Sequence, residues 1–422
     1  MAIITGTPGD DILTGTVNND VIDGLTGADQ MSGLAGLDVY YVDNANDIVN
    51  DSDDNTVINT TISYNLADVV GFTPVSGGTG LTLNLLADAI TGTGTKGNDT
   101  IVSFGSNTTL IGLDGDDILK GGEFSLVRGQ GGNDVLEITG LSSNGTLIGG
   151  RGNDTYNVYS TSGSLTIDES TDNGNGVDTI VSSVDFSLNS PPAGVTILGD
   201  IENLELTSTA IFGEGNALNN TIFGNIQNNT LLGLAGNDTI YGNDGNDQID
   251  GGADNDTLEG NAGDDLIYGG DGNDNIFGDN PAGTQSGVDR LNGQGGNDTL
   301  TGGLGIDVFE FGGSGLSTRQ QGISNSIGRD TIVDFNSGQG DQIYLRQESF
   351  TELDFGVLDS SDITFVTTNN GIGANDSLLV YNTVTGELLY NQNGSATGIG
   401  DGGFFATLTG APTLTASDIV VI

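Results

Sequence analysis

The residues of this chain that could do chemistry are aspartates repeated at a nine-residue spacing. Ten consecutive units start at residues 215, 224, 233, 242, 251, 260, 269, 278, 293 and 302. The plainest, GLAGNDTIY at 233–241 and GGDGNDNIF at 269–277, fit the pattern G-G-x-G-x-D-x-U-x, where U is a large apolar residue. Only the unit at 278 is longer, by residues 281–286. Aspartate holds position six of each unit except the first two, where Asn220 and Asn229 replace it.

Stacking of these units predicts two rows of carboxylates. Alternate units fall on opposite edges of a coil, which gives one row of Asp238, Asp256, Asp274 and Asp298 and another of Asp247, Asp265, Asp289 and Asp307. Two bare carboxylates about 4 Å apart repel by about 4 kcal/mol at an effective dielectric constant near 20. A cation is therefore expected between neighbours, and carboxylate and carbonyl oxygens favour Ca²⁺, with its flexible ligand shell, over Mg²⁺. The alternative, that the aspartates only cap glycine turns, does not explain the nine-residue period.

Short strands and glycine loops must position these carboxylates. The x-U-x half of each unit predicts a three-residue strand whose middle side chain points inward, and the glycine half predicts a loop with positive φ angles. Two units make one coil of eighteen residues, and stacked coils bury an aliphatic ladder between two parallel sheets. The expected inward residues are Ile222, Leu231, Ile240, Ile249, Leu258, Ile267, Ile276, Leu291, Leu300 and Phe309.

Two less regular tracts of the same pattern lie upstream. Units at 6, 15, 24 and 33 carry Asp11, Asp20, Asp29 and Asp38, and the tract from about 94 to 157 keeps Asp99, Asp117, Asp134 and Asp154. In this second tract the intervening units, SFGSNTTLI at 103–111 and GLSSNGTLI at 140–148, lack the acid. We therefore expect calcium along one edge and an ion-free opposite edge. The first tract has only two coils and is expected to need its neighbours, and the Asn220 and Asn229 coil is interpreted as a weakened cap.

The fold expected is all-β, an elongated parallel β-roll solenoid of three tracts with strand-rich spacers and a C-terminal antiparallel cap. The segments are 1–43 (first roll), 44–91 (spacer), 92–158 (second roll), 159–212 (spacer), 213–312 (third and most regular roll) and 313–422 (cap and export segment). The two spacers resemble each other. VYYVDNANDIV follows Asp38, and TYNVYSTSGSLTI follows Asp154. These two aspartates are 116 residues apart, and the corresponding Leu66 and Leu188 are 122 residues apart. The similar spacing indicates a duplicated module.

The nonapeptide resembles the calcium-binding repeat of RTX, or hemolysin-type, proteins, and the chained modules resemble those of bacterial secreted RTX proteins. The segments GRDTIVDFNSGQGDQIYL (328–345) and SLLVYNTVTGELLYNQNG (377–394) resemble the end segment of serralysin-like exoproteins. This resemblance implies that the region caps the last coil and that an uncleaved C-terminus directs type I secretion. An alternative reading is that Phe335, Ile343, Leu345, Tyr381 and Tyr390 are only the core of a small β cap, and both can hold.

Composition narrows the function further. The 58 acidic and 8 basic residues give a net charge of −50, which makes nucleic acid and anionic membranes poor partners. With no His and no Cys, the usual zinc, copper and iron sites are excluded. The start MAIITGTPGDDIL has no basic or long apolar stretch, so no conventional signal peptide is expected, and no apolar run reaches the length of a membrane span. High charge with few aromatics also predicts a chain that is largely unfolded without calcium.

We expect a secreted, extracellular protein that folds on calcium after type I export and is structural or associated with the cell surface or exopolysaccharide. No enzyme is expected, because the first unit begins at Gly6, histidine is absent and no G-x-S-x-G motif occurs. A polysaccharide-acting enzyme using a carboxylate pair remains an alternative, although the chain has no Trp for sugar stacking. A second alternative is a calcium-binding accessory to a separate effector chain.

Overall fold

The computed structural model describes residues 1–52, 56–73, 78–140, 143–170, 176–280, 286–312, 328–369, 377–392 and 403–422. These form two compact units, residues 1–184 with 190–203 and residues 185–189 with 204–422. Across the described ranges the chain has strands, two short 3-10 helices, η1 (Leu66–Asp68) and η3 (Ala416–Asp418), and no α-helix. The all-β prediction is confirmed. Most of the predicted insertion, residues 281–285, lies outside the described residues.

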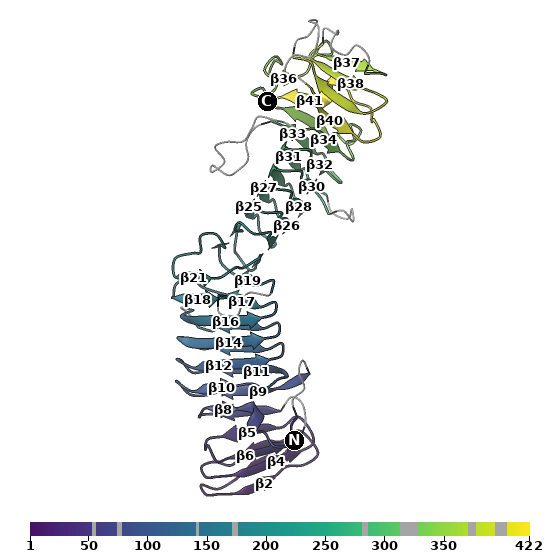
Figure 1. The fold of residues 1–422 in the computed structure, drawn as a ribbon. Helices are drawn as coiled ribbons and strands as arrows, with labels where there is room; N and C mark the ends of the chain where they lie inside the picture. Colours follow the sequence, from purple (N-terminus) through teal and green to yellow (C-terminus); the bar gives the residue numbers. More distant parts are fainter. Residues whose placement is uncertain are drawn as a thin grey trace. The chain divides into compact units, whose positions relative to one another are not determined.

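The first unit is a roll of two parallel sheets whose strands follow one another as rungs in Figure 1. One sheet pairs in succession β1 (Ile3–Thr5), β3 (Val21–Asp23), β5 (Val39–Val42), β7 (Val57–Thr60), β9 (Thr79–Leu85), β11 (Asn98–Ser103), β13 (Ile118–Gly121), β15 (Val135–Ile138), β17 (Thr155–Val158) and β19 (Thr179–Ser182). The other side of the coil carries β2 (Ile12–Thr14), β4 (Gln30–Leu34) and β6 (Ile48–Asp51), then β8 (Tyr64–Asn65), β10 (Thr91–Thr93), β12 (Thr109–Asp114), β14 (Ser125–Gly131), β16 (Gly145–Arg151), β18 (Leu165–Asp168) and β21 (Val195–Leu198).

The strands of the first predicted spacer, and β18, β19 and β21 of the second, belong to this same roll. Val39 pairs with Val57, eighteen residues on, and Val57 pairs with Thr82, twenty-five residues on. The inward residues Ile58 and Leu83 are fully buried, as the inward residues of the glycine units are. A spacer coil is therefore an ordinary coil with a longer connection, because parallel pairing requires only the inward alternation and not the glycine loop.

The second unit repeats the arrangement. One sheet pairs β20 (Phe186–Ser187), β23 (Phe212–Glu214), β25 (Thr230–Ala235), β27 (Gln248–Ala253), β29 (Leu266–Asp271), β31 (Arg290–Gly295), β33 (Val308–Phe311), β35 (Gln342–Leu345) and β41 (Ile419–Val421). The other pairs β24 (Thr221–Phe223), β26 (Thr239–Asp244), β28 (Thr257–Ala262), β30 (Asn275–Phe277), β32 (Thr299–Thr301), β34 (Asp330–Ile332) and β40 (Phe404–Leu408). β22 (Asn203–Leu206) begins at the last residue of the first unit.

The predicted aliphatic ladder is confirmed. All ten position-eight residues from Ile222 to Phe309 have no exposed surface. The predicted positive φ angles occur at position four, for example 112° at Gly236 and 131° at Gly263. Position two is also left-handed, yet it accepts Leu234 at 86° and Gln294 at 68°. The loops therefore use the left-handed region at two positions, and glycine is not required at both.

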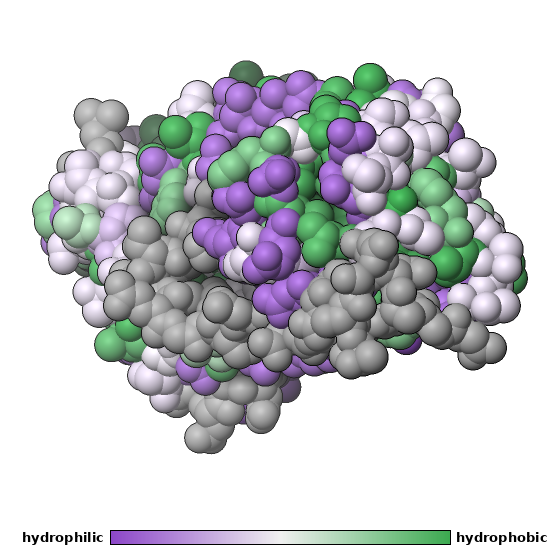
Figure 2. All heavy atoms as spheres, turned by 90° about the horizontal axis from the view of Figure 1, so that it is seen from above, coloured by the Kyte–Doolittle hydropathy of each residue, from purple (hydrophilic) through white to green (hydrophobic). Residues whose placement is uncertain are grey.

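The cap closes the second unit with both kinds of pairing. β38 (Leu379–Asn382), β39 (Glu387–Tyr390) and β40 form antiparallel pairs, as expected, and β36 (Gly356–Val357) pairs antiparallel with β41. β40 and β41 also extend the two roll sheets in parallel, and β37 (Ile363–Val366) lies parallel to β38. Phe335, Ile343, Leu345, Tyr381 and Tyr390 are buried, as the core reading predicted. The view from above in Figure 2 shows hydrophobic and hydrophilic residues interspersed on the part of that face not drawn grey.

Candidate metal-binding rows

The position-six aspartates of the second unit lie in two hydrogen-bonded rows, as predicted. In each row an aspartate Oδ1 accepts the backbone N–H of the row member one coil earlier. Asp256 accepts from Asp238 at 2.7 Å and Asp274 from Asp256 at 2.9 Å. On the opposite edge Asp265 accepts from Asp247 at 2.7 Å. Asp298, Asp289 and Asp307 continue the two rows in the same way.

The second carboxylate oxygen of most row members is buried and accepts no hydrogen bond. The aspartates concerned are at most 2% exposed, so water does not replace the missing donor. A buried carboxylate with one unsatisfied oxygen is costly unless a cation compensates it. The described Oδ2 atoms in this state belong to Asp29, Asp117, Asp134, Asp238, Asp247, Asp256, Asp265, Asp274, Asp289 and Asp298.

Burial raises the pKa values of these carboxyl groups. Desolvation, opposed by the hydrogen bond from Asp238, raises the pKa of Asp256 to about 8. The same balance raises the pKa of Asp247 to about 7 and that of Asp274 to about 8, and neighbouring aspartates add to the rise of the Asp274 pKa. Asp117, in the first unit, reaches about 9. The rows therefore resist holding negative charge in the absence of a counter-ion.

Glycine at position one leaves room for this oxygen. A Cβ added at Gly251 would overlap both Asp256 Oδ2 and the carbonyl oxygen of Gly269 in the next coil. The φ angle of Gly251 lies outside the left-handed region, so space and not backbone strain requires glycine there. The same two kinds of oxygen converge at Gly233 and Gly260. A carboxylate and a carbonyl oxygen from successive coils thus face one small space on these rungs, which suits a cation with all-oxygen ligands.

A second ladder, at position five, was not predicted. Asn237 Oδ1 accepts the N–H of Asn255 at 3.1 Å, and Asn255 Oδ1 accepts that of Asn273 at 2.8 Å. These side chains reach toward the following coil, whereas the aspartates reach toward the preceding one. The repeated Asn-Asp dipeptide in the sequence is the signal that could have predicted this second ladder.

The rows of the second unit extend beyond the glycine repeats. Asp330 Oδ1 accepts the N–H of Asp298 and Asp341 Oδ1 that of Asp307, each at 3.1 Å. Sequence reasoning missed both because their units lack glycine at positions one and two, where Asn and Ser stand instead. The D-T-I at 330–332 and D-Q-I at 341–343 still match the second half of the repeat, and this half pattern could have found them.

Asparagine begins both rows of this unit, but its coil is not the end of the roll, because β20 and β23 precede β25 in the same sheet. Asn229 Oδ1 accepts the N–H of Asn225 at 2.8 Å, and its Nδ2 donates to the carbonyl oxygen of Ala210 at 3.1 Å. A neutral amide satisfies both of its polar atoms within the protein. The first coil therefore ends the row without a buried charge.

The first unit has one long row and two short ones. In the long row Asp117 accepts from Asp99 and Asp134 from Asp117, followed by Asp154, Asp178 and Glu202. Asp178 and Glu202 were not predicted, although Asp178 opens another D-T-I. The aspartates of the first tract form the two short rows, as expected. Asp38 accepts the N–H of Asp20 in one row, and Asp29 accepts the N–H of Asp11 in the other. Asp47 adds a member to the latter row.

The edge of the second tract that lacks aspartate carries hydroxyl groups instead. Ser125 Oγ accepts the N–H of Thr108 at 3.1 Å, as an aspartate would, and the two hydroxyl oxygens lie 2.7 Å apart. Thr108 Oγ1 also donates to Ser103 Oγ at 2.9 Å. These neutral groups satisfy one another. The predicted ion-free edge thus carries neutral hydroxyl groups at these positions. Whether it binds calcium stays a prediction.

Comparison with protein families identifies the repeats. The family model described as the RTX calcium-binding nonapeptide repeat (4 copies) matches residues 5–40, 103–123, 138–157, 214–249, 223–258, 250–280 and 284–314. The predicted resemblance to RTX repeats is thereby confirmed, and these repeats support Ca²⁺ as the bound ion. The matches end at residue 314, so the serralysin-like end segment stays a prediction. No curated protein matches the chain. No helix within the described ranges is long and apolar enough to cross a bilayer.

Proposed function

Because this chain is a calcium-binding protein of the RTX repeat type, we propose that it is a secreted structural or cell-surface-associated protein that folds on calcium after type I export. One observation carries the calcium-dependent part. Both units contain rows of buried carboxylates with unsatisfied oxygens, and several of these oxygens lie beside a carbonyl oxygen of the next coil. Such rows are unfavourable in a metal-poor cell interior and favourable where calcium is abundant.

The size of the effect is set by linkage. Extracellular calcium modules have dissociation constants near 10⁻⁴ M, and calcium at about a hundred times that value stabilises by about 2.7 kcal/mol per site. Several such sites together supply more than the typical net stability of a domain, about 5–15 kcal/mol. The chain would therefore be mostly unfolded before export and compact after it.

A chelation experiment tests the calcium switch. Far-ultraviolet circular dichroism of the full chain should lose its β-sheet signal in EDTA and regain it cooperatively when excess calcium is added. Magnesium at the same concentration should restore much less of the signal, because it requires stricter octahedral geometry. A spectrum unchanged by EDTA in a sample shown to be metal-free would refute the proposal.

Export and location are tested in cells. The resemblance of the C-terminal region to serralysin-like exoproteins supports a type I route. Deleting residues 413–422 from the full chain, expressed with a type I secretion apparatus, should keep the protein inside the cell. With the intact chain, washing cells with chelator should release surface-bound protein if calcium holds it there. Secretion that is unaffected by the deletion would contradict the proposed C-terminal secretion signal.

We also propose that the chain has no catalytic role of its own. The support is that the buried position-six carboxylates already hold backbone N–H groups in the rows, which leaves them poorly placed as an acid and base pair. Release of reducing or unsaturated sugar ends from exopolysaccharide by the purified, calcium-loaded chain would favour the polysaccharide-acting alternative. Activity appearing only with a co-secreted second protein would favour the accessory role.

A further inference from the structure

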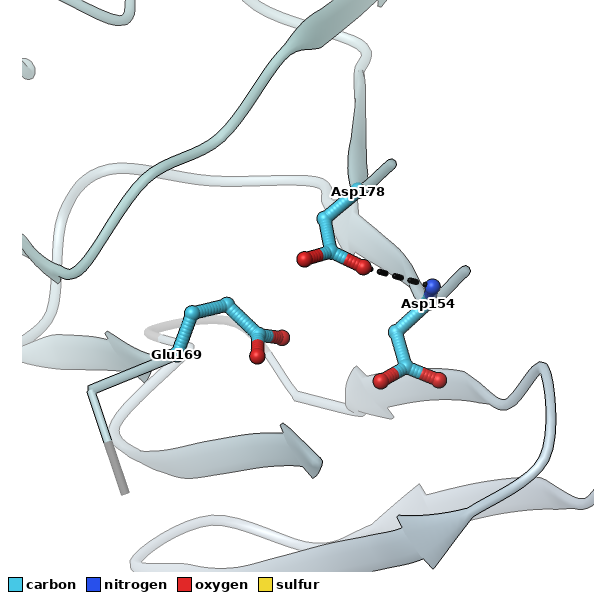
Figure 3. Close-up of side chains that lie close together, drawn as sticks. All are labelled: Asp154, Glu169 and Asp178. Atoms are coloured by element: carbon cyan, nitrogen blue, oxygen red, sulfur yellow. Dashed lines mark hydrogen bonds between the residues drawn. The ribbon is translucent and has the colours of Figure 1, made fainter. Parts of the chain in front are cut away.

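The end of the long row in the first unit differs from its other rungs. Asp154, Glu169 and Asp178 each offer a carboxylate oxygen, and the three oxygens lie within 4.8 Å of one another. All three side chains are at least 96% buried. Figure 3 shows the carboxylates turned toward a common space, with Asp178 accepting the N–H of Asp154. They come from three segments, just before β17, just after β18 and just before β19.

Glu169 occupies the place that glycine holds on the other rungs. Leu147 of β16 pairs with Ile167 of β18, so two residues further on Glu169 comes opposite Gly149. At the preceding rung a Cβ on Gly129 would meet Asp134 Oδ2 and the carbonyl oxygen of Gly149. At this last rung a carboxylate side chain enters the row from the strand that would otherwise supply only a glycine. The rung thus combines three acidic residues where the others combine two.

An acidic cavity opens on this rung. It has a volume of about 280 Å³ and is lined by Glu169, Ser170, Gly176, Asp178, Gly199, Asp200 and Glu202. At Gly199, φ is 92° and an added Cβ would lie 2.9 Å from the Glu169 Cβ. Two of the three carboxylate residues, Glu169 and Asp178, line this cavity. Two further acids, Asp200 and Glu202, line it as well.

The third roll also has acidic residues beyond its glycine units, and one carboxylate oxygen there has no hydrogen-bond partner among the described residues. Leu300 pairs with Ile332, so Asp334 comes opposite Gly302, and its carboxylate accepts the N–H groups of Gly302 and Gly303 at 3.0 and 2.8 Å. Asp279 packs against the same loop, accepting the N–H of Leu304 at 2.6 Å. Its Oδ1 is buried without a hydrogen bond, and the residue is 3% exposed. An acid thus again comes opposite a position-one glycine after the last glycine unit of a roll, although Asp334 is only partly buried and both of its oxygens accept N–H groups.

We propose that Asp154, Glu169 and Asp178 bind a further calcium ion that closes the first unit's row. This inference rests on the proposed calcium function and extends it to residues outside the nonapeptide pattern. Three carboxylates carry more negative charge than the two of an ordinary rung, so this site should bind calcium more tightly and fill first as calcium rises. Filling it would fix β17, β18 and β19 together and allow the row to load from that end.

The number of calcium ions bound per chain tests the site. Glu169→Gln and Asp178→Asn, made separately in the full chain, should each bind one calcium ion fewer than the parent, measured by equilibrium dialysis with elemental analysis. The loss should be in the tightest class of sites. Asp168→Asn is the matched control, because the carboxylate of this partly exposed neighbour accepts hydrogen bonds from the N–H and the hydroxyl group of Ser170. That variant should keep the parent's number of ions.

A structure of the calcium-loaded parent protein provides a test that does not depend on the folding of any variant. An anomalous peak among the three carboxylates is expected, and its absence while other rungs are occupied would overturn the proposal. Equal stoichiometry in the parent and in a folded Glu169→Gln variant would overturn it as well. If the parent bound no calcium at all, the proposed function itself would fail, so the two failures are distinct.

Discussion

At position six, a single carboxylate serves two purposes with its two oxygens. One oxygen accepts a backbone N–H from the preceding coil, and the other faces the carbonyl oxygen of the following coil. Aspartate suits this geometry because its short side chain holds both oxygens close to the backbone. Asparagine at the start of a row differs, because Asn229 Oδ1 accepts the N–H of Asn225 within its own unit. It therefore has neither the N–H contact to the preceding coil nor the charge of the aspartates.

This difference predicts opposite effects of one substitution in two media. Asp256→Asn should lower the free energy of unfolding in calcium by about 2–3 kcal/mol when calcium is about a hundred times the dissociation constant. In EDTA at pH 8 it should stabilise whatever folded protein remains, because it removes a buried charge. Thermal unfolding in the two media measures both effects. Asp254→Asn, at an exposed loop residue, should change either value by less than about 0.5 kcal/mol.

The space at position one leads to a second prediction. Gly251→Ala introduces a Cβ that overlaps Asp256 Oδ2 and the Gly269 carbonyl oxygen, so it should weaken calcium binding and cost about 1–3 kcal/mol by overpacking. Isothermal titration calorimetry and thermal unfolding in calcium measure the two effects. Gly9→Ala is the control, since a Cβ there meets only Thr7 Oγ1, at 4.0 Å. Equal behaviour of the two variants would show that the space in front of Gly251 has no role.

At the scale of elements, an arginine–glutamate–arginine group joins the third roll to its cap. Glu310, at the end of β33, is fully buried and accepts from Arg290 on β31 and Arg346 after β35. Both arginines are 35% exposed, and the Arg290 guanidinium also lies 5.7 Å from the ring centre of Tyr344. This group fixes neighbouring strands by side-chain contacts where the glycine repeats end. Its contribution should not depend on calcium.

Glu310→Gln should therefore destabilise the second unit by about 2–3 kcal/mol, because two charge-assisted hydrogen bonds are weakened in a partly solvated site. The loss should be the same at low and at saturating calcium, which chemical denaturation at two calcium concentrations measures. Glu387→Gln breaks the more exposed pair with Arg329 and should cost no more than about 1 kcal/mol. A calcium-dependent loss in the Glu310 variant would place Glu310 in the ion-binding system instead.

At the scale of the whole molecule, the raised pKa values predict how stability depends on pH. Carboxyl groups with an ordinary pKa near 3.8 titrate near 7 to 8 in the folded rows. The folded state then binds more protons than the unfolded state between these values. Without metal, the free energy of unfolding should be largest near or below pH 4 and should fall as the pH rises through 7 to 8.

Calcium should reverse this dependence, because it binds the deprotonated carboxylates. In excess calcium, stability should rise from pH 5 to pH 8. Thermal unfolding across this range, with EDTA and with calcium, measures both slopes. Parallel slopes in the two conditions would show that the row carboxylates are not the groups linking protons to calcium.

The nine-residue spacing by itself determined the parallel roll, its aliphatic ladder and the two aspartate rows, because a strict period forces equivalent residues into register when coils stack. Asp330 and Asp341 escaped prediction because their units lack the glycines of positions one and two. The spacer strands were expected, but their place in the roll was not, because their connections vary in length. Only the tertiary structure brought Glu169 beside Asp154 and Asp178. Those residues follow no common spacing, and their meeting depends on strand pairing between segments joined by irregular loops.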